Sequence, residues 1–353
     1  MHGKKRRGRM AQLKNSISVA GIQDAQSNAR LGSSNFQAGS WSSDDCKVVA
    51  VFGAFGTEPG QFNHPKGIAL DGNGHLLVLD SSNARVQRLT GEGKFLGSFG
   101  RYGSVNGQFA SPTALTSGPG GRLYIADSGN ACVCRYNRDG VHEVTYGGYG
   151  TSGGFFTLPA GIALSADGHL FVSDTNSTRV QVLDADGGFV RYFGGLGTSS
   201  SPLRAPVGIA IGHDDLVYVS DRDGDCVQVY SQAGTYIRRI GTSGSGHGEL
   251  QKPLGIAIDP AGNVFVADSA NHRIVIFEAN GTCIGHFGSR GSGAGKMLSP
   301  SDVAVDAEGH VYVADCENHR IQVFAMGPAE APQKGLFAGL GTFAANCLAR
   351  FRK

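Results

Sequence analysis

The feature that most constrains the fold is a fixed internal period of 47 residues. An aspartate recurs six times at this spacing, at Asp80, Asp127, Asp174, Asp221, Asp268 and Asp315. A proline keeps the same spacing, at Pro65, Pro112, Pro159, Pro206, Pro253 and Pro300. Because two residue types hold one spacing over six copies, chance is excluded, and a period of this length is typical of repeat architectures.

Each repeat predicts four short strands joined by turns. A glycine-rich stretch ending in the proline precedes the first strand, as in GIAI at 255–258. A polar turn leads to a second strand that ends at the aspartate, as in VFVAD at 264–268. A D-x-x-N-x-R turn opens the third strand, and the fourth strand closes on an aromatic residue and a glycine, as at 99–100. With 55 glycines in the chain, this pattern indicates an antiparallel four-stranded meander.

The predicted fold class is therefore all-β, a six-bladed β-propeller of four-stranded antiparallel blades. One such sheet cannot bury both faces alone, so the six repeats are expected to stack around a ring. KVVAVFG at 47–53 has the pattern of a fourth strand without its preceding three, and the sixth repeat lacks a fourth strand. The N-terminal strand is thus expected to close the last blade and remove the open edges. The alternative is KGLFAGLG at 334–341, which comes late by the repeat spacing.

The repeat divides the chain into three predicted parts. Residues 1–45 form a flexible basic N-terminal arm, and residues 46–327 form the propeller. Residues 328–353 form a C-terminal tail whose apolar residues recur at the spacing of a short amphipathic helix. The arm contains KKRRGR, which is compatible with a plain flexible arm, with nuclear targeting or with phosphate contacts.

Cysteine usage and targeting signals bear on the compartment. The seven cysteines are odd in number and include no C-x-x-C pair, which favours reduced thiols over disulfides or a zinc site. Cys132 and Cys134 alternate on one predicted strand, so both are expected on the same face. No signal-peptide segment follows the arm and no apolar run approaches 18 residues, so no membrane span is expected. We expect a cytoplasmic protein, with a nuclear location through KKRRGR as the alternative.

The sequence N-H-R-I, at 271–274 and 318–321, resembles the NHL repeat. The first repeat reads NARV, while the second to fourth depart further, with NACV, STRV and GDCV. The resemblance covers about residues 47–327. It implies a propeller and, as in tripartite-motif proteins, the binding of protein or RNA partners in ubiquitin ligation or mRNA control. Ligase activity is not carried over, because the chain has no Cys/His array for zinc modules. The peptide-amidating lyase, a secreted relative with metal ions in its channel, is disfavoured by the unpaired cysteines and the lack of clustered histidines.

Two aspartate and histidine pairs raise the question of catalysis. Asp268 with His272, and Asp315 with His319, are the residue types of an acid–base pair or a metal site. A catalytic acid is needed once, whereas this aspartate occupies six equivalent positions. We interpret the six as structural anchors that accept turn N–H groups or pair with the arginine five residues on. The two histidines lack identifiable further ligands. No catalytic residue, metal or cofactor is predicted.

Candidate partner-binding residues lie where a propeller exposes its loops. The loop from each fourth strand to the next first strand, and the turn between the second and third strands, emerge on the same face. Together they carry 11 basic and 11 acidic residues, and the basic ones gather from blade five round to the start of blade two. Tyr102 adds a stacking surface there. The expected partner-binding residues are Lys66, Arg85, Arg101, Tyr102, Lys252, His272, Arg273, Arg290, Lys296, His319 and Arg320.

The charge balance favours a non-enzymatic recognition scaffold that binds a protein partner through this face. Residues 48–327 carry 19 Lys/Arg against 25 Asp/Glu, which weighs against RNA because RNA-binding domains usually show a basic footprint. RNA binding at the basic sector of blades five, six and one, in post-transcriptional regulation, is the first alternative. A metal-dependent propeller lyase or lactonase is the second. No DNA partner is expected, and the sequence does not indicate an oligomeric state.

Overall fold

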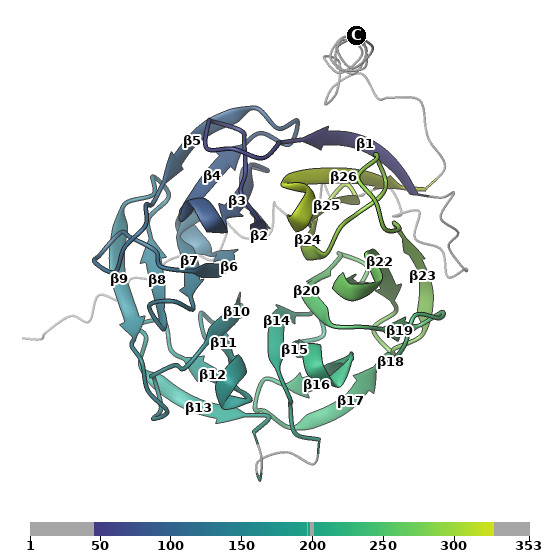
Figure 1. Cartoon of the computed structure of the whole chain (residues 1–353). Coiled ribbons are helices and arrows are strands. Elements are labelled where there is room, and N and C mark those ends of the chain that lie inside the picture. Colours follow the sequence, from purple (N-terminus) through teal and green to yellow (C-terminus); the bar gives the residue numbers. More distant parts are fainter. Residues whose placement is uncertain (1–45, 196, 198–200, 328–353) are drawn as a thin grey trace, which may run out of the picture. The chain divides into compact units, whose positions relative to one another are not determined.

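Six four-stranded antiparallel sheets form the blades of a closed propeller (Figure 1). The structure is a computed structural model, and it describes residues 46–195, 197 and 201–327. The predicted arm at 1–45 and tail at 328–353 lie outside the described residues. The prediction of an all-β, six-bladed propeller is confirmed.

In every blade the first strand lies nearest the central axis and the fourth lies outside (Figure 1). Blade one contains β2 (Pro65–Leu70), β3 (Leu76–Asp80), β4 (Arg85–Leu89) and β5 (Phe95–Phe99). Blade two contains β6 (Pro112–Ser117), β7 (Leu123–Asp127), β8 (Cys132–Tyr136) and β9 (His142–Gly147). Blade three contains β10 (Pro159–Leu164), β11 (Leu170–Asp174), β12 (Arg179–Leu183) and β13 (Phe189–Phe193).

The remaining blades follow the same order, except that the last takes its outer strand from the beginning of the chain. Blade four contains β14 (Pro206–Ile211), β15 (Leu216–Asp221), β16 (Cys226–Ser231) and β17 (Tyr236–Ile240). Blade five contains β20 (Pro253–Ile258), β21 (Val264–Asp268), β22 (Arg273–Phe277) and β23 (Cys283–Phe287). Blade six contains β24 (Pro300–Val305), β25 (His310–Asp315), β26 (Arg320–Met326) and β1 (Cys46–Phe52). The loop between blades four and five adds a short parallel pair, β18 (Thr242–Ser243) and β19 (Glu249–Leu250).

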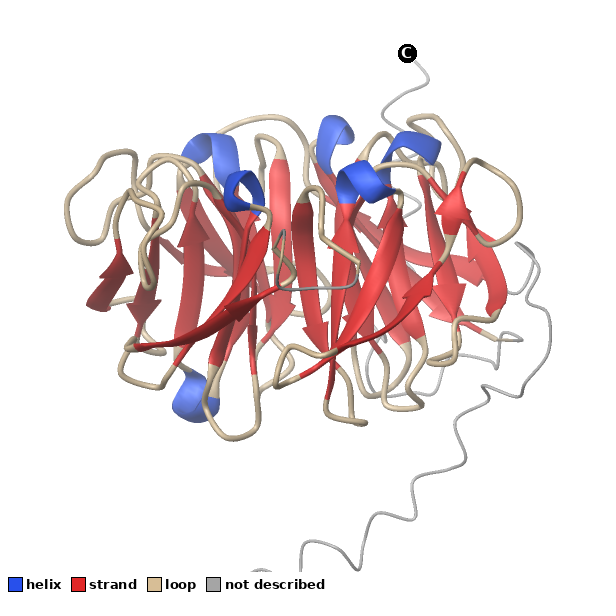
Figure 2. Cartoon of the chain, turned by 90° about the horizontal axis from the view of Figure 1, so that it is seen from below, coloured by secondary structure: helices blue, strands red, loops and turns tan. Residues whose placement is uncertain are grey.

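Short 3₁₀ helices distinguish the two faces of the propeller (Figure 2). In five blades the second strand leads directly into such a helix: η2 (Ser81–Asn83), η4 (Thr175–Ser177), η5 (Arg222–Gly224), η6 (Ser269–Asn271) and η7 (Cys316–Asn318). We call the face that carries them the loop-rich face. The helix η3 (Pro119–Gly121) lies in the turn between β6 and β7, at the opposite face. None of the helices in the described ranges is long and apolar enough to cross a lipid bilayer.

The N-terminal strand closes the ring, as predicted. β1 pairs antiparallel with β26, in a register that runs from Cys46 opposite Met326 to Phe52 opposite Ile321. Phe52 also packs on the core shared by blades six and one. The alternative segment at 334–341 lies outside the described residues. Because β1 pairs along the outer edge of β26, blade six has four strands, as every other blade does.

The core lies between neighbouring blades. Each loop that joins two blades contributes one buried apolar side chain at the same repeat position: Phe62, Phe109, Phe156, Leu203, Leu250 and Met297. Phe62, for example, packs against Ile68 of β2 and Ile321 of β26, so it joins blade one to blade six. The apolar residue thereby fixes each interblade loop to the blades on both sides.

The inner strands approach one another so closely that most blades carry glycine at one position. A β-carbon on Gly161 would overlap the carbonyl oxygen of Val207 on the next inner strand. Blade six departs from this pattern with Asp302, whose carboxylate accepts the backbone N–H of Ile68 at 2.9 Å. This hydrogen bond crosses from blade six to blade one near the central axis.

The thiols have the predicted arrangement. The sulfur atoms of Cys132 and Cys134 lie 3.8 Å apart on one face of β8, and both residues are buried. All six cysteines in the described part of the chain are free thiols.

Candidate functional site

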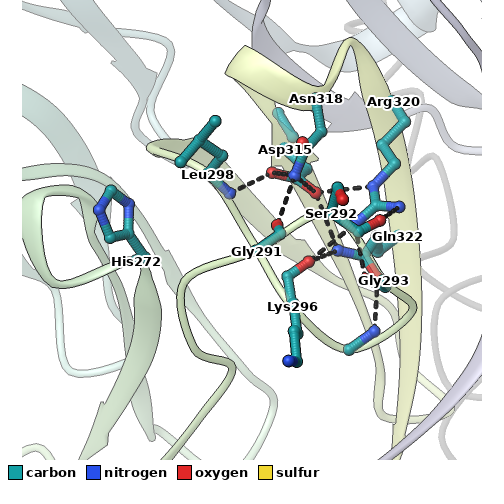
Figure 3. Close-up of polar contacts among 12 residues, drawn as sticks. His272, Gly291, Ser292, Gly293, Lys296, Leu298, Asp315, Asn318, Arg320 and Gln322 are labelled. Atoms are coloured by element: carbon teal, nitrogen blue, oxygen red, sulfur yellow. Dashed lines mark hydrogen bonds and ion pairs between the residues drawn. The ribbon is translucent and has the colours of Figure 1, made fainter.

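Each repeated aspartate lies fully enclosed where the second strand of its blade ends, with at most 1% of its surface exposed. Figure 3 shows this arrangement in blade six. The Asp315 carboxylate accepts the backbone N–H of Leu298 at 2.7 Å and the side-chain amide of Asn318 at 2.9 Å. It also accepts the Nε of Arg320 at 2.7 Å and the amide of Gln322 at 2.9 Å. A carboxylate held by this many donors joins the interblade loop, the turn and the third strand.

In four of the six blades an arginine lies five residues after the anchor, and it points inward. Arg320 donates to the backbone carbonyl groups of Ser292, Gly293 and Lys296, all in the interblade loop, at 2.6 to 2.8 Å (Figure 3). Arg273 makes the equivalent contacts in blade five. The carbonyl groups of the interblade loop therefore turn toward the arginine of the blade, and these hydrogen bonds hold the loop against the blade.

This inward direction applies to three residues of the predicted partner-binding set. The side chains of Arg85, Arg273 and Arg320 are only 16%, 8% and 12% exposed. Their guanidinium groups are held by the anchor and by loop carbonyl groups, which leaves few of their donors for a partner. The physical reason is that a guanidinium supplies several donors in one plane, which matches a carboxylate and adjacent carbonyl groups together.

The two histidines fasten one blade to the next. His272 and His319 both have left-handed backbone conformations, with φ of 58° and 53°. The Nδ1 of His272 accepts the backbone N–H of Ser299 at 3.0 Å, and the Nδ1 of His319 accepts that of His64 at 3.1 Å. Burial lowers the pKa of both imidazoles below its usual value. An accepting Nδ1 requires the neutral ring, so the depressed pKa agrees with the hydrogen bond.

The position of these histidines, which we call the turn residue, is filled differently around the ring. Asp225 occupies it in blade four and accepts the backbone N–H of Lys252 at 2.8 Å. We call the contact between two adjacent blades a seam, and the seams 4/5, 5/6 and 6/1 are clasped in this way. The other turn residues are Ala84, Ala131 and Thr178. At their seams the corresponding loop N–H groups, of Ser111, Leu158 and Ala205, donate to the anchor of their own blade instead.

Three consecutive interblade loops carry an exposed aromatic ring. Phe55, Tyr102 and Tyr149 share one repeat position and are 66%, 77% and 83% exposed. Phe55 lies against His319, with the ring centroids 4.9 Å apart. By repeat equivalence the neighbours of Tyr102 and Tyr149 are Ala84 and Ala131, which offer no ring. Tyr102 belongs to the predicted set; Phe55 and Tyr149 were missed, although the 47-residue period places all three in register.

Five predicted cations remain at the surface, and all lie in interblade loops or at strand starts: Lys66, Arg101, Lys252, Arg290 and Lys296. Four arginines and six aspartates on the loop-rich face are enclosed in the anchors. Of the 11 basic and 11 acidic residues, seven basic and five acidic therefore stay outside these networks. The solvent-facing charge of this face is close to balance.

The central channel opens on the loop-rich face as a cavity of about 360 Å³. Its lining is rich in hydroxyl groups, including Thr113, Thr175 and Ser301. These three donate to backbone carbonyl groups of the neighbouring blade. Among the residues that the structure describes, no three His, Cys, Asp or Glu side chains converge as a metal site would require.

Comparison with known proteins agrees with this architecture. The NHL repeat model matches residues 62–89, 109–136, 156–183, 250–277 and 297–324, which are five of the six blades. A 44-residue stretch, 12% of this chain, is 46% identical to the B-box type zinc finger protein ncl-1 of Caenorhabditis elegans. That match spans only 5% of the worm protein.

Solved structures with the same fold include enzymes. A streptogramin B lyase is 12% identical with a TM-score of 0.57, over 80% of this chain and 98% of the other. Virginiamycin B lyase from Staphylococcus aureus is 15% identical with a TM-score of 0.57, over 80% and 99%. A gluconolactonase from Xanthomonas campestris is 17% identical with a TM-score of 0.59, over 76% and 88%. Identities this low show a shared fold alone. With five matching repeats in a ring of six four-stranded blades, the chain belongs to the NHL-repeat family of β-propellers.

Proposed function

We propose that this chain is a non-enzymatic recognition scaffold that binds a protein partner through its loop-rich face. One observation carries the proposal, namely the gathering of exposed apolar side chains on three consecutive interblade loops. Of the 12 large hydrophobic residues that are exposed in the described part of the chain, five lie there: Phe55, Tyr102, Val105, Tyr149 and Phe155. Aromatic residues are enriched and charged residues depleted at the centres of protein interfaces, which matches these loops.

RNA binding at the basic sector is the second candidate. It is supported by the five exposed cations at Lys66, Arg101, Lys252, Arg290 and Lys296. Affinity for a nucleic acid depends on the number of phosphate contacts, and the inward-turned arginines reduce the number available. The lyase or lactonase alternative rests on fold likeness alone.

Two further observations support a cellular context for the scaffold. The worm relative is named for its B-box, which supports work alongside a ubiquitin-ligase system as in tripartite-motif proteins. The free thiols support a reducing compartment, so we propose a cytoplasmic location, with the nucleus as the alternative.

Site-specific photo-crosslinking tests the proposal. A photo-reactive phenylalanine analogue replaces Tyr102 in the full chain, and a matched control replaces Val141. Val141 belongs to the same blade and is 59% exposed, but lies in the turn before β9 at the opposite face. After illumination in the cells that make the protein, the scaffold predicts a protease-sensitive, nuclease-resistant adduct at position 102 and none at 141. An adduct removed by ribonuclease, an equal yield at both positions, or no adduct at 102 contradicts the proposal.

A further inference from the structure

The seams of the propeller differ in which side chain contacts the turn residue at the loop-rich face. At 4/5 the hydroxyl of Ser243 donates to Asp225 at 2.7 Å. At 6/1 the imidazole of His319 lies between two rings, 4.9 Å from that of Phe55 and 4.6 Å from that of His64. Both contacts are edge-on, with interplanar angles of 61° and 82°. At these two seams the turn residue contacts the interblade-loop residue, Ser243 or Phe55, which occupies one repeat position that we call the loop residue.

Among the residues that the structure describes, two neighbouring seams have the aromatic residue without such a partner. At 1/2 the turn residue is Ala84 and the loop residue is Tyr102; at 2/3 they are Ala131 and Tyr149. The two tyrosines are 77% and 83% exposed, more than Phe55 beside its histidine. A large aromatic ring that stays this exposed does not contribute the stabilisation that its burial would give the fold. The most exposed rings are therefore the two whose turn residue has no side chain long enough to cover them.

Charge around these two rings is nearly absent. The turns at 81–84 and 128–131 and the loop at 147–158 contain no Lys, Arg, Asp or Glu. The loop at 100–111 contains only Arg101. A polyanion would find one exposed cation here, whereas an uncharged peptide would meet two rings and many backbone groups. The local chemistry therefore favours a peptide over an RNA.

We propose that seams 1/2 and 2/3 are two adjacent ring sites that receive aromatic or imidazole side chains from one extended, uncharged segment of a partner protein. Each incoming ring takes, against Tyr102 or Tyr149, the place that His319 takes against Phe55. The inference rests on the proposed function and names the partner chemistry of the same face. Edge-on and offset ring contacts of this kind add to the burial of the rings themselves, so two of them on one segment reinforce each other.

The test uses the full chain and a phage library of random 12-residue peptides. The best-enriched peptides are synthesised, and their affinity is measured by fluorescence anisotropy. We expect enriched peptides to carry two residues drawn from Phe, Tyr, Trp and His. Tyr102→Ser with Tyr149→Ser should weaken binding at least about tenfold, as for the loss of interface anchors. Val141→Ser is the matched control, since this exposed apolar side chain lies in the turn before β9 at the opposite face, and it should change affinity less than about threefold. Equal thermal melting of the three proteins shows that the fold is retained.

Three results overturn the inference. One is a library in which ring residues are not enriched. Another is peptide binding that the double variant leaves within about twofold of the wild type. The last is a fluorescein-labelled uridine decamer that binds the wild type and loses at least tenfold in the double variant, which would make the occupant a nucleic acid. In the first two cases a protein adduct that still forms at position 102 leaves the proposed function intact. If no such adduct forms, both the inference and the proposed function are contradicted.

Discussion

Arg273 and Arg290 carry the same charge in neighbouring parts of the loop-rich face, yet the fold uses them differently. The first is enclosed by its anchor and three loop carbonyl groups, and the second is exposed. The two arginines share a residue type but occupy different positions of the repeat: the one five residues after the anchor turns inward, whereas Arg290 lies in an interblade loop and stays in solvent. A charge count from the sequence therefore overstates the cations that a ligand could reach.

Replacing the enclosed arginine should cost far more stability than replacing the exposed one. Burial already raises the pKa of Asp268, against the opposing hydrogen bonds. Arg273→Gln leaves that carboxylate without its cation and should lower the free energy of unfolding by about 3 to 5 kcal/mol. Arg290→Gln should change it by less than about 0.5 kcal/mol. Urea unfolding measures both, and equal effects would show that the arginine network is not structural.

The clasping histidines should make stability depend on pH. Their folded-state pKa is lowered by burial, so their contribution is present above the unfolded value of about 6.5 and is lost as pH falls below it. Asparagine can accept the same N–H in a left-handed conformation without titrating. Between pH 7.5 and pH 5, the wild type should lose about 1 kcal/mol more than His272→Asn with His319→Asn. Groups common to both proteins cancel in this comparison, and identical pH profiles would show that the two imidazoles do not stabilise the seams.

At the scale of elements, strands and loops were not equally predictable. The repeated proline and aspartate mark where first strands begin and second strands end, and the register of Phe52 identified β1 as the closing strand. Periodicity fixes such positions because strand length and turn spacing repeat together. The pairing of Arg320 with Asp315 was predicted, but the hydrogen bonds of Arg320 to the interblade loop and the clasp of His319 were not. Both depend on which loop atoms approach from the next blade, and spacing along one repeat carries no information about that.

Removing the closing strand should open the ring. A chain that begins at Gly53 lacks β1, which exposes the edge of β26 and the apolar residues packed on Phe52. Burial of two or three such side chains stabilises a domain by about 1.5 to 3 kcal/mol each, so the loss should exceed about 3 kcal/mol. Thermal melting and size-exclusion chromatography should show a lower midpoint and association through the free edge. A chain that begins at Cys46 is the control, and equal midpoints would mean that β1 does not close the propeller.

At the scale of the whole molecule, the ring is regular in backbone and asymmetric in its loop-rich face. The three seams from blade four round to blade one are clasped by Asp225, His272 and His319. The 6/1 seam has a second bond between its blades, since Asp302 accepts the backbone N–H of Ile68 near the axis, and the pairing of β1 with β26 completes blade six at the rim. Seams 1/2 and 2/3 lack the clasp and expose Tyr102 and Tyr149. One part of the ring thus fastens the closure while the neighbouring part presents aromatic surface, which is a suitable division for a scaffold that must stay closed while binding.

Hydrogen–deuterium exchange tests this division most directly, because it reports every loop at once. The full chain is compared free and saturated with its best-enriched peptide. A peptide bound at seams 1/2 and 2/3 should slow exchange in the loops at 100–111 and 147–158, with no change at 289–299 or in the turns of the opposite face. Protection centred on 289–299 and Lys252, or on the opposite face, would contradict this expectation, since binding would then use the basic sector or another surface altogether.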